Sequence, residues 1–134
     1  MIVEDNKVNQ EVAHRYMERL SYQPILSNNG RDAIQKLRER SFDLILMNCQ
    51  MPKMDGYEAT RRIRSGEAGS ENKNIYIVAM TANAMKGDRQ KCMEAGMNGY
   101  LSKPMKIPEL QKALENCANG IKLTPKGDSS SESA

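Results

Sequence analysis

The chain of 134 residues is poor in the residue types that mark several classes of protein. It has no Trp, one Phe and one His. Its three cysteines, Cys49, Cys92 and Cys117, lie far apart without metal-binding spacing, which favours reduced thiols over disulfides. With a single His, no Ser–His or Cys–His catalytic pair is evident.

Long apolar runs and strong charge are also missing. No apolar stretch reaches the ~20 residues needed to cross a bilayer, and no signal peptide is visible. The net charge is only +3 with scattered basic residues, so a nucleic-acid surface is not indicated. We interpret Arg61, Arg62 and Arg64 as a solvated helix face and His14 as a packing or surface residue. The apolar content of 39% and charged content of 28% fit one globular domain.

Strand-like and helix-like patterns alternate along the chain, which favours an α/β fold with a parallel sheet and helices on both faces. Strands are predicted at residues 1–4, 24–27, 42–47, 75–80 and 100–102. Helices are predicted after a cap at Asp5 or Asn6, at 31–40, up to Arg64, at 85–95 and from Pro108. The first helix is predicted to bury Val8, Val12, Ala13, Tyr16, Met17 and Leu20.

Two segments look irregular. Residues 65–74 are interpreted as a flexible surface loop. Residues 119–134 are rich in Gly, Lys, Asp and Ser, with almost no apolar residue after Leu123, which is typical of a linker or disordered tail. We therefore expect a domain at 1–118 and a flexible tail at 119–134. Only three residues precede Glu4, so we expect the sequence to be a piece of a longer protein.

Polar residues follow four of the apolar runs. They are Glu4-Asp5, Asn48, Thr81-Ala82 and Lys103-Pro104. The carboxyl ends of parallel strands share one edge of a sheet, where ligands bind, so these residues should converge. Two carboxylates, an amide, a hydroxyl and an amine suit a divalent cation and a phosphoryl group. Asn48 lies at the centre, but an amide cannot form an acyl phosphate.

The four sequence segments that carry these residues read VEDN at 3–6, LMNCQMPKMDGYEA at 46–59, MTANA at 80–84 and YLSKP at 100–104. In order and spacing they resemble the response-regulator receiver domains of two-component signalling, from Met1 to about Cys117. These segments are most similar to those of receivers attached to hybrid sensor histidine kinases. The resemblance implies a flavodoxin-like, doubly wound sheet of five parallel strands in the order 2-1-3-4-5.

The resemblance also implies a setting and a partner. The partner would be a phosphohistidine on a histidine kinase or histidine phosphotransfer domain, with no direct contact to nucleic acid or membrane. A cytoplasmic, bacterial protein is expected.

The resemblance implies a magnesium site as well. Receivers carry aspartate, the phosphoryl acceptor, at the position of Asn48. In receivers the residue matching Asp5 binds Mg²⁺ directly, the one matching Glu4 usually binds through water, and a backbone carbonyl matching Gln50 also binds. The Asn48 carbonyl oxygen offers a weak further ligand. Because Asn48 lacks the carboxylate charge, we expect the affinity for Mg²⁺ to be lower.

The remaining site residues take roles only through the resemblance. Lys103 would contact the phosphoryl oxygens, and Thr81 would swing toward the phosphoryl group while the Tyr100 ring turns inward. Small Ala82 would leave room for a phosphodonor. Gln50 and Asn83 would tune dephosphorylation, and the Lys103-Pro104 bond is often cis in this family.

Three interpretations of Asn48 stay open. It is a satisfied polar residue at a strand end, an engineered Asp→Asn change that traps the unphosphorylated state, or the mark of a natural pseudo-receiver that acts as an interaction module. An enzyme or nucleotide-binding protein of the same fold class is the remaining alternative. It is disfavoured because the loop after the first strand, Asp5 to Val8, has no glycine-rich phosphate cradle.

Overall fold

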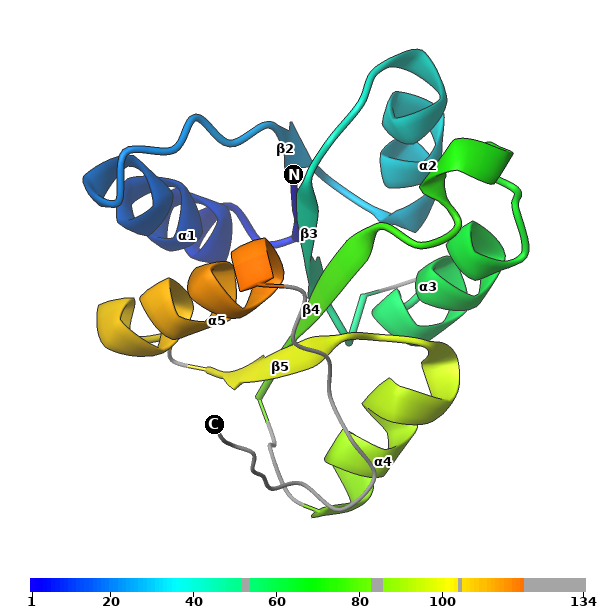
Figure 1. The fold of residues 1–134 in the computed structure, drawn as a ribbon. Helices are drawn as coiled ribbons and strands as arrows, with labels where there is room; N and C mark the ends of the chain where they lie inside the picture. The colour runs from blue at the N-terminus through cyan, green and yellow to red at the C-terminus, as the bar shows by residue number, and fades with distance from the viewer. Residues whose placement is uncertain (52–53, 83–85, 104, 120–134) are drawn as a thin grey trace.

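A five-stranded parallel sheet forms the centre of the molecule, with helices on both faces (Figure 1). The structure, a computed structural model, describes residues 1–51, 54–82, 86–103 and 105–119. The strands are β1 (Ile2–Val3), β2 (Leu26–Ser27), β3 (Leu44–Asn48), β4 (Tyr76–Thr81) and β5 (Gly99–Ser102). Their order is β2-β1-β3-β4-β5, which confirms the predicted doubly wound, flavodoxin-like arrangement.

The helices lie on either side of the sheet, and three of them start after a polar residue that caps the first turn. They are α1 (Lys7–Arg19), α2 (Gly30–Glu39), α3 (Gly56–Arg64), α4 (Lys86–Ala95) and α5 (Ile107–Asn119), with a short 3₁₀ helix at Ser70–Asn72. Asn6, Asn29 and Asp55 each accept a hydrogen bond from a backbone N–H in the first turn of α1, α2 and α3, respectively, as polar residues at this position commonly do. Gly96 follows α4 with a φ of 101°, which suits the predicted glycine cap.

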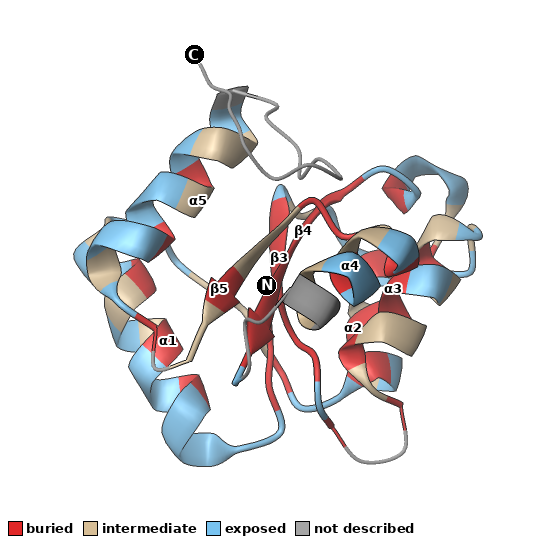
Figure 2. Ribbon diagram, turned by 90° about the horizontal axis from the view of Figure 1, so that it is seen from below, coloured by how far each residue is buried: buried red, intermediate tan, exposed pale blue. Residues whose placement is uncertain are grey.

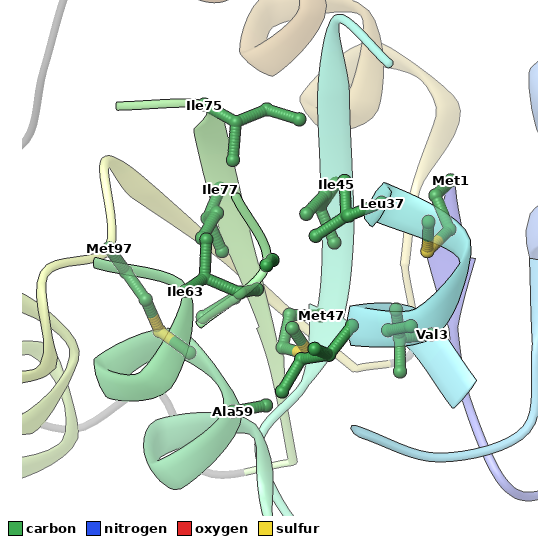
Figure 3. Close-up of a cluster of buried hydrophobic side chains, with 14 of the residues drawn as sticks. Met1, Val3, Leu37, Ile45, Met47, Ala59, Ile63, Ile75, Ile77 and Met97 are labelled. Carbon is green, nitrogen blue, oxygen red and sulfur yellow. The ribbon is translucent and has the colours of Figure 1, made fainter. Parts of the chain in front are cut away.

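Each face of the sheet has its own apolar core. Alternate strand residues point to opposite faces, so Val3, Ile45 and Ile77 pack toward α2, α3 and α4, whereas Leu46 and Val78 pack toward α1 and α5. Figure 3 shows the first core around Val3, Ile45 and Ile77. Figure 2 shows the consequence: the central strands are buried and the outer helix surfaces are exposed. The central strands are therefore covered by packed side chains on both faces, and the site residues lie where these strands end.

The predicted buried face of α1 was partly wrong. Val8 and Val12 are 69% and 38% exposed, while Gln10, Ala13 and Met17 are buried. At about 100° per residue, Val12 lies about 100° around the helix from Ala13 and so points away from the core. Val8 and Val12 are four residues apart and so share one side of α1, but that side does not face the core.

Arg64 corrects the interpretation of the basic residues on α3. Arg61 and Arg62 pair with Glu58 at the surface, as expected of a solvated face. Arg64 is half-buried instead. Its guanidinium donates hydrogen bonds to the carbonyl oxygens of Gly96, Lys73 and Ile75 and to Asn98 Oδ1. Burial lowers the pKa of Arg64, and the four acceptors join α3 to the segments before β4 and β5.

The segment at 65–74 is more ordered by contacts than its composition suggested. It contains the 3₁₀ helix, and Ala68 and Asn72 are buried. The Asn72 amide donates to the carbonyl oxygens of Leu37 and Ala68. The structure describes the chain as far as Asn119, which ends α5, so the tail expected at 119–134 lies outside the described residues from residue 120 on, and the division into domain and tail stays a prediction. Within the described part, no helix has the length and apolar character needed to cross a membrane.

Candidate functional site

The ends of β1, β3, β4 and β5 meet at one edge of the sheet. Asn48 ends β3 and pairs in register with Met80 of β4. The backbone N–H of Lys103 donates to the Thr81 carbonyl oxygen at 2.8 Å, and that of Glu4 donates to Ser27. The parallel ladder thereby brings together residues that lie up to 99 positions apart in the sequence.

The Asn48 side chain is the centre of the site. Its Nδ2 donates to Glu4 Oε2 at 2.9 Å, to Asp5 Oδ1 at 3.2 Å and to the Gln50 carbonyl oxygen at 3.0 Å. Its Oδ1 accepts from Lys103 Nζ at 2.9 Å and from the Gln50 backbone N–H at 3.4 Å. Asn48 is 4% exposed, so this network replaces water almost completely.

Glu4 is a buried carboxylate whose charge is compensated. It is 1% exposed, and Lys103 Nζ lies 3.0 Å from its Oε1. The other oxygen accepts from the Asn48 amide and from the Asn6 backbone N–H. A buried charge is costly unless it is paired and hydrogen-bonded, and Glu4 meets both conditions. Asp5 is exposed and keeps its contact with water.

Two residues that support the site were not identified from the sequence. Gln10 donates to the Glu4 carbonyl oxygen at 2.5 Å and to Asn28 Oδ1 at 2.8 Å. Gly56 begins α3 directly against the end of β3. A Cβ at this position would lie 2.2 Å from the Asn48 carbonyl oxygen, so a side chain does not fit there. A polar residue three positions before Ala13 on the buried face of α1 was the available signal for Gln10. No local pattern distinguishes Gly56 from an ordinary turn glycine.

The expected switch residues lie around this centre. Thr81 ends β4 and is buried. Ala82 is exposed, and Tyr100 is half-buried with the Arg89 guanidinium 5.7 Å from its ring centroid. Asn83 and Pro104, including the expected cis bond, lie outside the described residues. His14 is half-buried on α1 with Nδ1 3.4 Å from Glu18 Oε1, in line with a packing or surface role.

A thiol cluster adjoins the site on the α3–α4 side. Cys49 and Cys92 are buried, and Tyr57 packs against the same core. The neighbouring Cys92 thiol and burial together raise the pKa of Cys49, so its thiol stays protonated. Burial likewise raises the pKa of Tyr57. Both residues line an open cavity of about 520 Å³ that also reaches Gln50, which gives this side of the site access to solvent.

The oxygens expected to bind Mg²⁺ do not form a free ligand set. Glu4 Oε2, Asp5 Oδ1 and the Gln50 carbonyl oxygen all face the Asn48 amide nitrogen. An amide N–H₂ group is a donor and does not ligate a cation. Among the described residues there is also no group of three His, Cys, Asp or Glu suited to a metal ion. As arranged, these residues do not fit a divalent cation.

Known proteins resemble the chain over most of its length. A family model described as the response regulator receiver domain matches residues 1–115. Hybrid signal transduction histidine kinase B of Dictyostelium discoideum is 38% identical over 118 residues, covering 82% of this chain and 6% of the kinase. The chain therefore spans a small part of that relative.

Solved structures agree with this result. The receiver domain of sensor histidine kinase PA1611 from Pseudomonas aeruginosa, which holds a magnesium ion in its active-site cleft, has 42% identity and a TM-score of 0.79. The match covers 88% of this chain and 94% of that one. The Saccharomyces cerevisiae Ssk1 receiver domain, solved with the phosphotransfer protein Ypd1, has 32% identity and a TM-score of 0.73, covering 83% and 81%. Since the relatives include eukaryotic proteins, the expected bacterial origin is not confirmed.

Proposed function

Because this chain belongs to the response regulator receiver domain family of two-component signalling, we propose that it is a phosphorylation-deficient receiver in which Asn48 stands at the phosphoacceptor position. The observation that supports this most directly is the placement of Asn48 between Lys103 and the acids Glu4 and Asp5. An acceptor carboxylate there would attack phosphorus while the phosphohistidine P–N bond breaks. The amide of Asn48 has no nucleophilic oxygen with which to form that acyl phosphate.

The other site residues then keep the geometry of a receiver without its trigger. Lys103 supplies an ammonium group for phosphoryl oxygens, and Thr81 and Tyr100 form the switch. In such a switch the new negative charge draws in the hydroxyl and the ammonium and repacks the last strand and helix. Without a phosphoryl group, the inactive arrangement dominates unless a partner binds the active one more tightly.

We propose a histidine kinase or histidine phosphotransfer domain as the partner, contacting the start of α1. Val8 and Val12 are exposed there, only a few residues after Asp5. Side chains four residues apart on a helix are neighbours, so Val8 and Val12 form a small apolar surface beside the site, and the related Ssk1 receiver was crystallised with Ypd1. Val8→Asp should weaken binding to immobilised Ypd1, whereas Tyr22→Asp, a change at an exposed residue just beyond the far end of α1, should not.

An interaction module that works without phosphorylation is the second candidate. It is favoured by the ion pair between Lys103 and Glu4 and by the hydrogen bond from Lys103 to Asn48, which satisfy the site without a phosphoryl group. Equal partner affinity of the native chain and Asn48→Asp would favour this candidate. A gain in affinity only after phosphorylation of Asn48→Asp would favour the receiver.

The decisive test is intact mass after incubation with a small-molecule phosphodonor and Mg²⁺. The native chain should stay unmodified, and Asn48→Asp should gain one phosphoryl group. Asn48→Ala serves as the control for modification elsewhere. If Asn48→Asp also stays unmodified, the site has lost more than its nucleophile and the receiver proposal fails. When Asp5→Ala is added to the Asn48→Asp variant, Mg²⁺ binding should be lost, because Asp5 is the direct ligand.

A further inference from the structure

We propose that the Asn48 amide nitrogen occupies the place of the divalent cation, so that the site is closed to Mg²⁺ by occupancy and not only by the loss of one negative charge. This inference rests on the proposed function, because it takes Glu4, Asp5 and Gln50 as the cation ligands. The inference goes beyond the proposed function because it assigns the Asn48 amide a role in stabilising the two acids.

The first support is the convergence of oxygens on one nitrogen. Three oxygens from Glu4, Asp5 and Gln50 lie between 2.9 and 3.2 Å from Asn48 Nδ2. An amide group offers two N–H donors, so three acceptors share two hydrogens. Such a surplus of acceptors, two of them carboxylates, is an environment that selects a positive group, and the partly positive N–H₂ group is the one that fills it.

The second support is that the amide cannot turn to present its oxygen. Asn48 Oδ1 accepts from the Lys103 ammonium, which has only donors to offer. Rotating the amide by half a turn would set its N–H₂ group against that ammonium and its oxygen against Glu4 and Asp5. The charges on both sides therefore fix one orientation, in which the nitrogen faces the acids.

The third support is that no buried charge at the site lacks a partner. Glu4 is buried and accepts hydrogen bonds from Lys103, Asn48 and the Asn6 backbone. A cation would have to displace the amide nitrogen and break its hydrogen bonds before it gained its own ligands. The loss of those bonds opposes cation binding in addition to the reduced charge.

The two explanations, occupancy of the site by the amide and loss of one negative charge, predict different cation affinities for Asn48→Ala. This variant has the same charge as the native chain but lacks the amide. If occupancy closes the site, Asn48→Ala opens it and binds Mn²⁺ more tightly than the native chain. If charge alone matters, the two bind equally, or Asn48→Ala binds more weakly because it also lacks the Asn48 carbonyl oxygen.

The experiment measures the binding of Mn²⁺ by electron paramagnetic resonance of the free ion, with the Mg²⁺ dependence of the melting temperature as a second readout. We expect no Mg²⁺-dependent shift for the native chain and at least about tenfold tighter Mn²⁺ binding by Asn48→Ala. Asn48→Asp should bind most tightly. Asn72→Ala, which removes another buried amide far from the acids, is the matched control and should behave as the native chain.

The outcomes separate this inference from the proposed function. If Asn48→Asp binds Mn²⁺ but Asn48→Ala binds no better than the native chain, the occupancy proposal is overturned and the receiver proposal stands. If Asn48→Asp does not bind either, the cation ligands are wrongly assigned and both fail. Should Asn48→Ala not fold, Asn48→Ser, whose shorter side chain also vacates the position of Nδ2, replaces it in the same comparison.

Discussion

Replacing Lys103 by methionine tests how the buried acid is held. Glu4, whose side chain is 1% exposed, would lose the ammonium group of Lys103, which lies 3.0 Å from its Oε1. Removing one partner of a buried ion pair costs about 3–5 kcal/mol. We expect about 2–3 kcal/mol here, because the Lys103 side chain is 23% exposed and Glu4 keeps its hydrogen bonds from Asn48 and Asn6.

The assay is urea unfolding followed by far-ultraviolet circular dichroism. With a slope of about 1–3 kcal/mol per molar urea, the midpoint should fall by roughly 0.7–3 M. Arg62→Met is the control: it breaks surface pairs with Glu58 at 2.9 Å and Glu67 at 3.4 Å in which all the side chains are well exposed, and such exposed pairs contribute little to stability.

A double variant identifies the cause. Glu4→Gln combined with Lys103→Met removes both charges, so it should be at least about 1 kcal/mol more stable than the sum of the single changes predicts. The reasoning is refuted if Lys103→Met lowers the midpoint no more than Arg62→Met does, or if the double variant shows no such recovery.

Three further predictions concern the scaffold. Arg64→Ala removes a guanidinium with four hydrogen bonds and should cost about 2–4 kcal/mol of unfolding free energy, whereas Arg61→Ala on the same helix should cost less than about 1 kcal/mol in the same urea assay. Gly56→Ala would place a Cβ 2.2 Å from the Asn48 carbonyl oxygen; it should lower the melting temperature and shift the Asn48 amide resonances, and an unchanged spectrum would contradict the close packing. Burial alone would raise the pKa of Asp32, but hydrogen bonds from Lys36 and Ser27 hold it below its ordinary value of 3.8. Its contribution is therefore present above that pH and lost as the pH falls through the folded-state pKa, so Asp32→Asn should flatten the acid limb of the stability profile.

The sheet and the site edge were predictable because their signals are local and repeated. Each short apolar run ends in a polar residue, and the parallel ladder converts those positions into neighbours. The order of strands and the place of Asn48 follow from this arrangement together with the resemblance. The bounds of the strands shifted by a few residues, as for β2, because pairing and not composition decides where a strand begins.

The remaining features depend on tertiary contacts that leave little trace in the sequence. Val8 has the apolar character of a core residue but lies on a side of α1 that is exposed in the described part of the chain. Arg64 is a residue type that usually lies at the surface, yet it is half-buried because it donates hydrogen bonds to oxygens of the segments before β4 and β5. Gly56 is required only because β3 passes within contact distance. For Arg64 and Gly56 the deciding contact is made by another element of the fold, and for Val8 the deciding fact is which side of α1 faces the sheet, so the local sequence pattern does not reveal the outcome.

The residues of the site are far apart in the sequence, so they are synthesised at different times. Asn48 and Lys103 are joined by a hydrogen bond across 55 positions, and Glu4 and Lys103 across 99. At synthesis rates of about 5–20 residues per second, Lys103 is added roughly 3–11 s after Asn48. During that interval Glu4, which follows β1, has no Lys103 ammonium group to pair with. A chain that ends before Lys103 would leave the buried Glu4 carboxylate without its ion pair, which is costly in a folded core.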